Sequence, residues 1–267
     1  MRDREQLSAL IKEFRKDDGD DSKTLDTQRV PTMLQGLVGG DLRDRLQESG
    51  PAFEADRVVD PYRNLDSVAD FLEAVSTRGC ATLEIGSQRG YFAVARANQC
   101  SDVPFLASEV RRTDCRRLLK RRDREEANNL FLMVGDVRLQ LLPLLKAGPV
   151  FEEVFILFPD PWWKKRHHKR RLFKEGFFDF LSHVVVPEGH VVLKTDVEGY
   201  RDEVLALLSE CGTFDLLDEP AFTEKYSNLP LSRREQELKN AGLPIYPLLM
   251  KRNENEAKNK LFESDED

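Results

Sequence analysis

Acidic residues follow several short apolar runs in the middle of this chain. Each run is typical of a buried strand, and the carboxylates after them are Glu84, Glu109, Asp136, Asp160 and Asp196. A single acid after a strand is often only the N-cap of the next helix. Five at the same ends of successive strands instead favour a ring of carboxylates around one polar, partly cationic ligand.

The first of these strand ends leads into a glycine turn. Gly86 permits the sharp turn, and Gly90 allows the next helix to approach a ligand closely. A carboxylate at the end of the following strand commonly binds a ribose diol, and Glu109 lies there, roughly 25 positions after Glu84. This pattern suits the adenosine of either NAD or S-adenosylmethionine.

The spacing of the two glycines bears on which of these cofactors is used. The NAD fingerprint G-x-G-x-x-G is absent, because Gln88 and Arg89 stand between the glycines. NAD is therefore disfavoured. Asp136, after the third strand, would suit the amino group of the adenine. A glycine turn that holds no ligand is the alternative.

The fourth strand ends in Phe-Pro-Asp-Pro-Trp-Trp (158–163), followed by a run of Lys, Arg and His (164–171). Prolines on both sides fix the backbone of Asp160 and hold its side chain at the strand end. Trp162 and Trp163 offer rings for base stacking, although either could be a core aromatic. The basic run contains no acid, and such self-repulsion indicates a polyanionic partner.

Short apolar runs alternate with amphipathic segments between these motifs. Strands are predicted at 81–86, 103–109, 129–136, 151–160 and 189–196, and near 214–217 and 245–250. Helices are predicted at 91–98, 112–126, 139–146, 174–185 and 197–211. The alternation predicts an α/β fold, with right-handed βαβ units and a mostly parallel sheet covered by helices on both faces.

Composition narrows the class of protein. Of 267 residues, 40% are hydrophobic and 33% charged, which excludes a collagen-like or wholly disordered chain. The formal net charge is −7, yet the middle of the chain is basic between acidic ends. A second basic run, 111–124, fits an RNA contact or a solvated helix face equally well.

Four cysteines lack metal-ligand spacing, so no metal site is expected, and they favour a reducing compartment. The first residues lack the apolar core of a signal peptide, and the apolar runs are too short to span a membrane. We expect a cytoplasmic protein with no membrane partner.

The stretch FPDPWWKKRHHKRR, together with EIG at 84–86, GD at 135–136 and TD at 195–196, resembles the tRNA (guanine-N7)-methyltransferases. The resemblance covers about residues 80–250. It implies the class I S-adenosylmethionine-dependent methyltransferase fold, which is Rossmann-like. It also implies methyl transfer from S-adenosylmethionine to N7 of a guanine in the variable loop of tRNA.

The resemblance also assigns site residues by position. The implied cofactor-binding residues are Glu84, Gly86, Glu109, Asp136 and Asp160, and Asp160 is also the implied catalytic carboxylate. The implied substrate contacts are Lys164 and Asp196. The family's T-x-x-E motif has its best counterpart in the substrate-contact candidates Ser232, Arg233, Arg234 and Glu235.

The chain departs from the family pattern at Gln88, where a glycine is usual, and at Tyr91, where a glutamate is usual. Alternatives are therefore a degenerate relative that binds RNA without methylating it, and a methyltransferase for another RNA guanine. The predicted organisation is a charged, partly ordered extension (1–60), a methyltransferase domain (61–252) and an acidic flexible tail (253–267). A monomer, a homodimer and a need for a partner subunit stay open.

Overall fold

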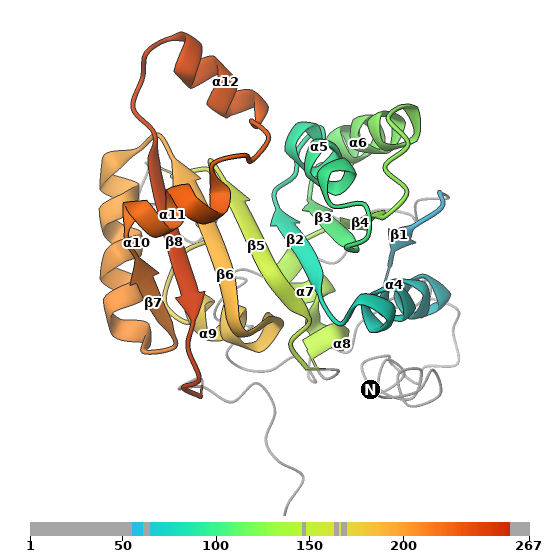
Figure 1. Cartoon of the computed structure of the whole chain (residues 1–267), viewed down its shortest axis with the longest axis horizontal. Helices are drawn as coiled ribbons and strands as arrows, with labels where there is room; N and C mark the ends of the chain where they lie inside the picture. The colour runs from blue at the N-terminus through green and yellow to red at the C-terminus, as the bar shows by residue number, and fades with distance from the viewer. Residues whose placement is uncertain (1–54, 61–64, 146–147, 163–165, 167–169, 257–267) are drawn as a thin grey trace, which may run out of the picture.

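The computed structural model describes residues 55–60, 65–145, 148–162, 166 and 170–256. Within them one sheet has eight strands, in the order β1-β4-β3-β2-β5-β6-β8-β7. All neighbouring strands pair in parallel except at β8, which is antiparallel to both β6 and β7. The predicted α/β class and mostly parallel sheet are confirmed (Figure 1).

The strands are β1 (Val58–Val59), β2 (Ala81–Ile85), β3 (Phe105–Glu109), β4 (Leu130–Val134), β5 (Phe151–Leu157), β6 (Val185–Thr195), β7 (Phe214–Leu217) and β8 (Tyr246–Arg252). The helices are α4 (Leu65–Arg78), α5 (Tyr91–Gln99), α6 (Arg112–Arg124), α7 (Val137–Gln140), α8 (Leu142–Leu145), α9 (Phe177–Val184), α10 (Glu198–Cys211), α11 (Glu219–Tyr226) and α12 (Arg233–Asn240).

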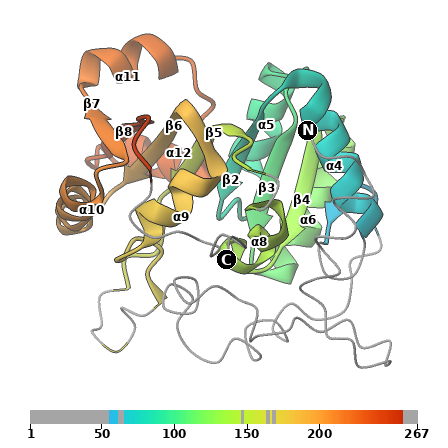
Figure 2. The same cartoon turned by 90° about the horizontal axis from the view of Figure 1, so that it is seen from below.

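Two apolar cores lie on opposite faces of the sheet, as a doubly covered parallel sheet requires. The larger packs α4, α7, α8, α9 and α10 on one face, around buried side chains such as Phe71, Phe151 and Phe177. The other packs α5, α6 and α11 on the opposite face, around Phe92 and Phe155. Figure 2, seen from below, shows both helix layers. None of the helices in the described ranges is long and apolar enough to span a membrane.

The structure contains three helices and one strand that the sequence patterns did not predict. They are α4, α11, α12 and the short edge strand β1, which pairs with β4 and falls inside the predicted 1–60 extension. The helix predicted at 139–146 is two short helices, α7 and α8. Residues 1–54 and 257–267 lie outside the described residues, so the predicted extension and tail stay predictions.

Candidate functional site

The carboxyl edge of the sheet gathers the acidic strand ends. β2 and β5 are neighbours in the sheet, but the chain leaves β2 for α5 on one face and leaves β5 for α9 on the other. Such a topological switch point is where open α/β sheets bind ligands. In Figure 1 this is the upper edge, with α5 and α6 on one side and α12 on the other.

Glu84 lies at the end of β2, at this switch point. Its side chain is buried, with 3% of the residue exposed, and Oε2 has no hydrogen-bond partner among the described residues. Burial raises the pKa of Glu84 to about 8, opposed by a hydrogen bond from Ser87 and reinforced by the charge of Glu109. An unpaired buried acceptor is costly, so this oxygen is poised to accept a donor from a ligand.

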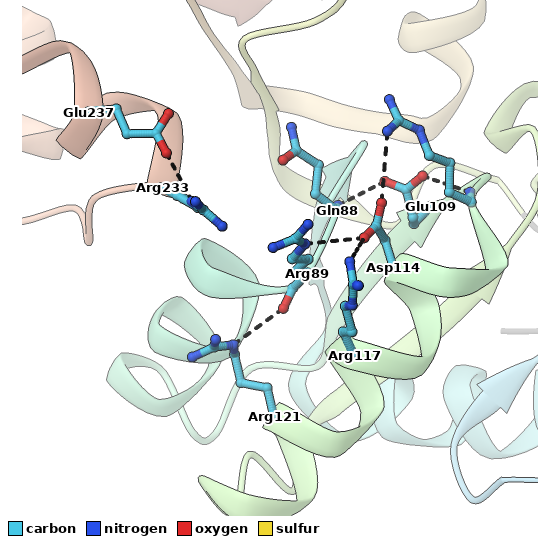
Figure 3. A network of polar contacts seen from close by, with 9 residues as sticks. Gln88, Arg89, Glu109, Asp114, Arg117, Arg121, Arg233 and Glu237 are labelled. Carbon is cyan, nitrogen blue, oxygen red and sulfur yellow. Dashed lines mark hydrogen bonds and ion pairs between the residues drawn. The ribbon is translucent and has the colours of Figure 1, made fainter.

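Glu109, at the end of β3, fastens the glycine turn to the next loop (Figure 3). Its Oε2 accepts the backbone N–H of Gln88 at 2.8 Å, and its Oε1 accepts the backbone N–H of Arg111 at 2.8 Å. Burial raises the pKa of Glu109, and these two N–H donors oppose the rise. Each oxygen keeps acceptor capacity, so a ribose contact is compatible with this arrangement.

Gln88 adopts a left-handed backbone conformation, with φ of 49°. A non-glycine residue in this region carries a steric cost of roughly 1–2 kcal/mol. The hydrogen bond to Glu109 helps to hold it there. The side chain of Gln88 is exposed at the edge of the sheet.

Asp136 follows β4 and caps the short helix α7, accepting the backbone N–H of Arg138 at 3.1 Å. The Arg138 guanidinium also donates to both carboxylate oxygens, at 2.8 and 2.6 Å. Both side chains are nearly buried. Asp136 therefore lies at the carboxyl edge of the sheet with its charge balanced by the Arg138 guanidinium, a partner that the sequence patterns did not reveal.

Asp160 lies just beyond β5, and it is exposed. The chain enters and leaves this turn through left-handed residues, Phe158 with φ of 54° and Trp162 with φ of 44°. The Arg170 guanidinium lies over the Trp162 ring, 5.2 Å from its centre. Arg171 donates to the carbonyl of Pro161 at 2.8 Å, which fastens the end of the basic run to the turn.

Asp196 follows β6 and accepts a hydrogen bond from Arg234 of α12. At the end of the same strand, Lys194 donates to both oxygens of Glu235, at 2.8 and 3.0 Å, and both side chains are buried. These contacts hold α12 against the carboxyl edge of the sheet.

Ser232 is the N-cap of α12 and accepts the backbone N–H of Glu235 at 3.1 Å. Arg233 is exposed and pairs with Glu237 at 2.9 Å. The S-R-R-E motif is therefore the start of a helix at the edge, with its glutamate turned inward and its arginines outward. Lys164, the remaining predicted substrate contact, lies outside the described residues.

A cluster around Asp114 was missed by the sequence patterns. Arg89, from the glycine turn, and Arg111 and Arg117, from α6 and the residue before it, all contact this one carboxylate. The mixture of many basic residues with only two acids, Asp114 and Asp123, in 111–124 was a signal, but only the fold brings Arg89 to Asp114. Among the described residues, no group of His, Cys, Asp and Glu could hold a metal ion.

Comparison with known proteins gives consistent results. The family model described as "Putative methyltransferase" matches residues 78–248. The chain is 34% identical over 171 residues to a protein of Nitrosococcus oceani named tRNA (guanine-N(7)-)-methyltransferase, which covers 64% of this chain and 70% of the relative. A protein of the same name from Neorickettsia sennetsu is 39% identical over 163 residues, covering 61% of this chain and 73% of the relative.

Among solved structures, the 16S rRNA methyltransferase KamB matches with a TM-score of 0.51 and 15% identity, covering 69% of this chain and 93% of that one. At this level of identity the likeness concerns the fold alone.

Proposed function

The chain belongs to the tRNA (guanine-N7)-methyltransferase family, and on that basis we propose that it transfers a methyl group from S-adenosylmethionine to N7 of a guanine in the variable loop of tRNA. The observation that carries the proposal is the unpartnered Oε2 of Glu84, buried at the switch point between β2 and β5.

The residues at this edge fit S-adenosylmethionine. Adenosine offers hydroxyl and amino donors, and the site offers carboxylates: Glu84 with its unpartnered oxygen, Glu109, whose two oxygens each accept a backbone N–H, and Asp136, which is paired with Arg138. Gly86, at φ of 82° with open space where a Cβ would stand, allows a ligand to approach the backbone closely. S-adenosylmethionine supplies an electrophilic methyl group on a sulfonium centre.

Guanine N7 carries an in-plane lone pair and no proton, so the transfer needs no general base. The protein has to hold the guanine in line with the methyl group and to stabilise the purine cation that forms. Asp160, in the turn just beyond β5, is the carboxylate that we propose for both roles. Its negative charge is screened while it is exposed to water, and its field strengthens when bound RNA excludes that water.

The target guanine must leave its stacked position in folded tRNA, at a cost of a few kcal/mol. Asp196 and the α12 residues Arg233 and Arg234 are proposed to meet the displaced nucleotide from the other side of the edge. Lys164 and the rest of the 164–171 run are proposed to bind backbone phosphates, which position the RNA but read no sequence. Because the substrate is tRNA, we place the protein in the cytoplasm.

The test is incubation of the purified full-length protein with methyl-labelled S-adenosylmethionine and unmodified tRNA. Label recovered as 7-methylguanosine, mapped to the variable loop, supports the proposal. Tight tRNA binding without label transfer would identify a degenerate RNA-binding relative. Label in another nucleotide would assign a different RNA substrate.

A further inference from the structure

We propose that the arginines gathered around Asp114 form a binding surface for the RNA phosphate backbone, directly beside the cofactor turn. We call Arg89, Arg111, Arg117 and Asp114 the Asp114 cluster. This inference rests on the proposed tRNA methyltransferase function and adds a surface separate from the 164–171 run.

The cluster is built on one nearly buried carboxylate. Arg89 Nε and Arg117 Nη1 lie 3.4 and 3.3 Å from Asp114 Oδ1, and Arg111 Nη1 lies 4.0 Å from Oδ2. The Asp114 side chain is 11% exposed, whereas those of Arg89, Arg111 and Arg117 are 43%, 67% and 56% exposed. Figure 3 shows Arg89 and Arg117 converging on Asp114 from two elements.

The cluster carries an excess of positive charge at its surface. Three guanidinium groups share one carboxylate, and each has five N–H donors, so most donors are left facing water. Holding like charges together is unfavourable unless an anion joins them. Guanidinium groups suit phosphate oxygens especially well, because they can donate two parallel hydrogen bonds.

Neighbouring residues fix the cluster in place. The Arg121 guanidinium lies 3.7 Å from the centre of the Tyr91 ring and donates to the backbone carbonyl of Arg89 at 3.3 Å. Arg121 also pairs with Glu125 at 3.0 Å. Tyr91 is 40% exposed as a residue, and its ring, held by Arg121, offers RNA an aromatic surface next to the arginines.

The position of the cluster favours RNA over a small anion. Arg89 belongs to the glycine turn that holds the cofactor site, and Arg233 of α12 reaches toward it from the opposite side (Figure 3). Basic side chains therefore border the site from the turn, from α6 and from α12. A polyanion that spans the site can contact all three, which a single phosphate ion cannot.

The experiment compares two double variants that remove the same charge. Arg111→Gln with Arg117→Gln removes the two most exposed cations of the cluster. Arg78→Gln with Lys251→Gln is the matched control. Each of these partly exposed cations is paired with a carboxylate, Arg78 with Asp102 and Lys251 with Glu188, and both lie at the opposite, amino edge of the sheet. Binding of unmodified tRNA is measured across a salt series.

Each lost phosphate contact should reduce the slope of log affinity against log salt by roughly 0.7–0.9. We expect the cluster variant to lose about 1.5 units of slope and about ten- to fifty-fold in affinity at 0.1 M salt. The control should match wild type. Equal losses in the two variants, or no loss in either, would overturn the proposal.

Two further arms separate the alternatives. Inorganic phosphate at constant ionic strength should not erase the difference between the variants, and if it does, the cluster binds free phosphate and the proposal is wrong. Methyl transfer at saturating tRNA tests the proposed function separately. Wild-type protein that transfers no methyl group refutes that function, while an unchanged slope alongside normal methyl transfer refutes only this surface.

Discussion

Gln88 donates its backbone N–H to Glu109 Oε2 from a left-handed conformation, so the tip of the glycine turn (86–90) is held to the end of the neighbouring strand. Glu109, which is proposed to bind the cofactor, therefore also fixes the conformation of the glycine turn that would approach the cofactor. Arg89, the next residue, is held from the other direction by Asp114 and Arg121. Changes in this turn should affect cofactor and RNA binding together.

Gln88→Gly should relieve the left-handed strain. The relief, roughly 1–2 kcal/mol, exceeds the added entropy of an unfolded glycine, roughly 0.5–1 kcal/mol. We expect the free energy of unfolding to rise by up to about 1 kcal/mol, measured by urea denaturation, and cofactor affinity to hold or increase. Gln88→Ala is the control, since it shortens the side chain but keeps the strain. A glycine variant no more stable than the alanine variant would contradict the prediction.

Glu84 should make stability and cofactor binding depend on pH. Its pKa is raised to about 8 in the folded protein, so its contribution to stability is complete below pH 4.5 and is lost as pH rises toward 8. The melting temperature of wild type should therefore fall over this range relative to that of Glu84→Gln. A difference in melting temperature between wild type and Glu84→Gln that does not change with pH would contradict the raised pKa of Glu84.

A donor that meets Oε2 favours the charged carboxylate, so cofactor binding near pH 7 should release a proton from Glu84. Calorimetry of S-adenosylmethionine binding in buffers of different ionisation enthalpy measures that release. Glu84→Gln should abolish it. Proton release that persists in the variant would assign it to another group.

The buried pair of Lys194 and Glu235 should stabilise the docking of α12. Glu235→Leu leaves the Lys194 ammonium buried without its partner, and we expect a loss of about 3–5 kcal/mol in the free energy of unfolding. The double variant Lys194→Met with Glu235→Leu removes both charges and should recover most of that loss. Equal destabilisation by the single and double variants would mean that the pair is not what anchors the helix.

Asp160→Asn should reduce the rate of methyl transfer by roughly 100- to 1,000-fold, because asparagine keeps the shape but loses the charge. Folding and tRNA affinity should stay near wild type, since Asp160 is exposed. If Asp160 only caps the turn, the change should be nearly neutral, because asparagine caps as well as aspartate.

Single-turnover rates at saturating tRNA and cofactor distinguish these readings of Asp160. Asp70→Asn, an exposed carboxylate on α4, is the matched control. An Asp160→Asn rate within a few-fold of wild type would move the catalytic assignment to Asp196.

The central strands and helices were predictable because their signals are local. β2 and β3 are short, mostly apolar and fully buried runs between polar turns. α10 is a long segment whose buried side chains recur at helical spacing after a clear strand end. Once the strands were placed in the sequence, the acidic residues at their ends could be predicted to lie at one edge of the sheet. α4 was not predicted, although its sequence carries the pattern of a helix, since Val68, Phe71 and Val75 recur at helical spacing and are buried.

α11 and α12 lack such a signal. α12 buries only Glu235 and Leu238, and α11 buries only Tyr226, so neither shows an apolar stripe. α12 is instead held by the pairing of Lys194 with Glu235, residues far apart in the sequence. The Asp114 cluster was hidden for the same reason, because Arg89 meets α6 only when the parallel sheet forms.

Methyl transfer to two forms of one tRNA tests the central claim most directly. One form carries guanosine at the variable-loop target, and the other carries 7-deazaguanosine, which replaces N7 by carbon and removes the lone pair. With labelled S-adenosylmethionine, the first should be methylated to completion. The second should bind equally well and take up no label. Equal labelling of both forms would contradict methylation at guanine N7.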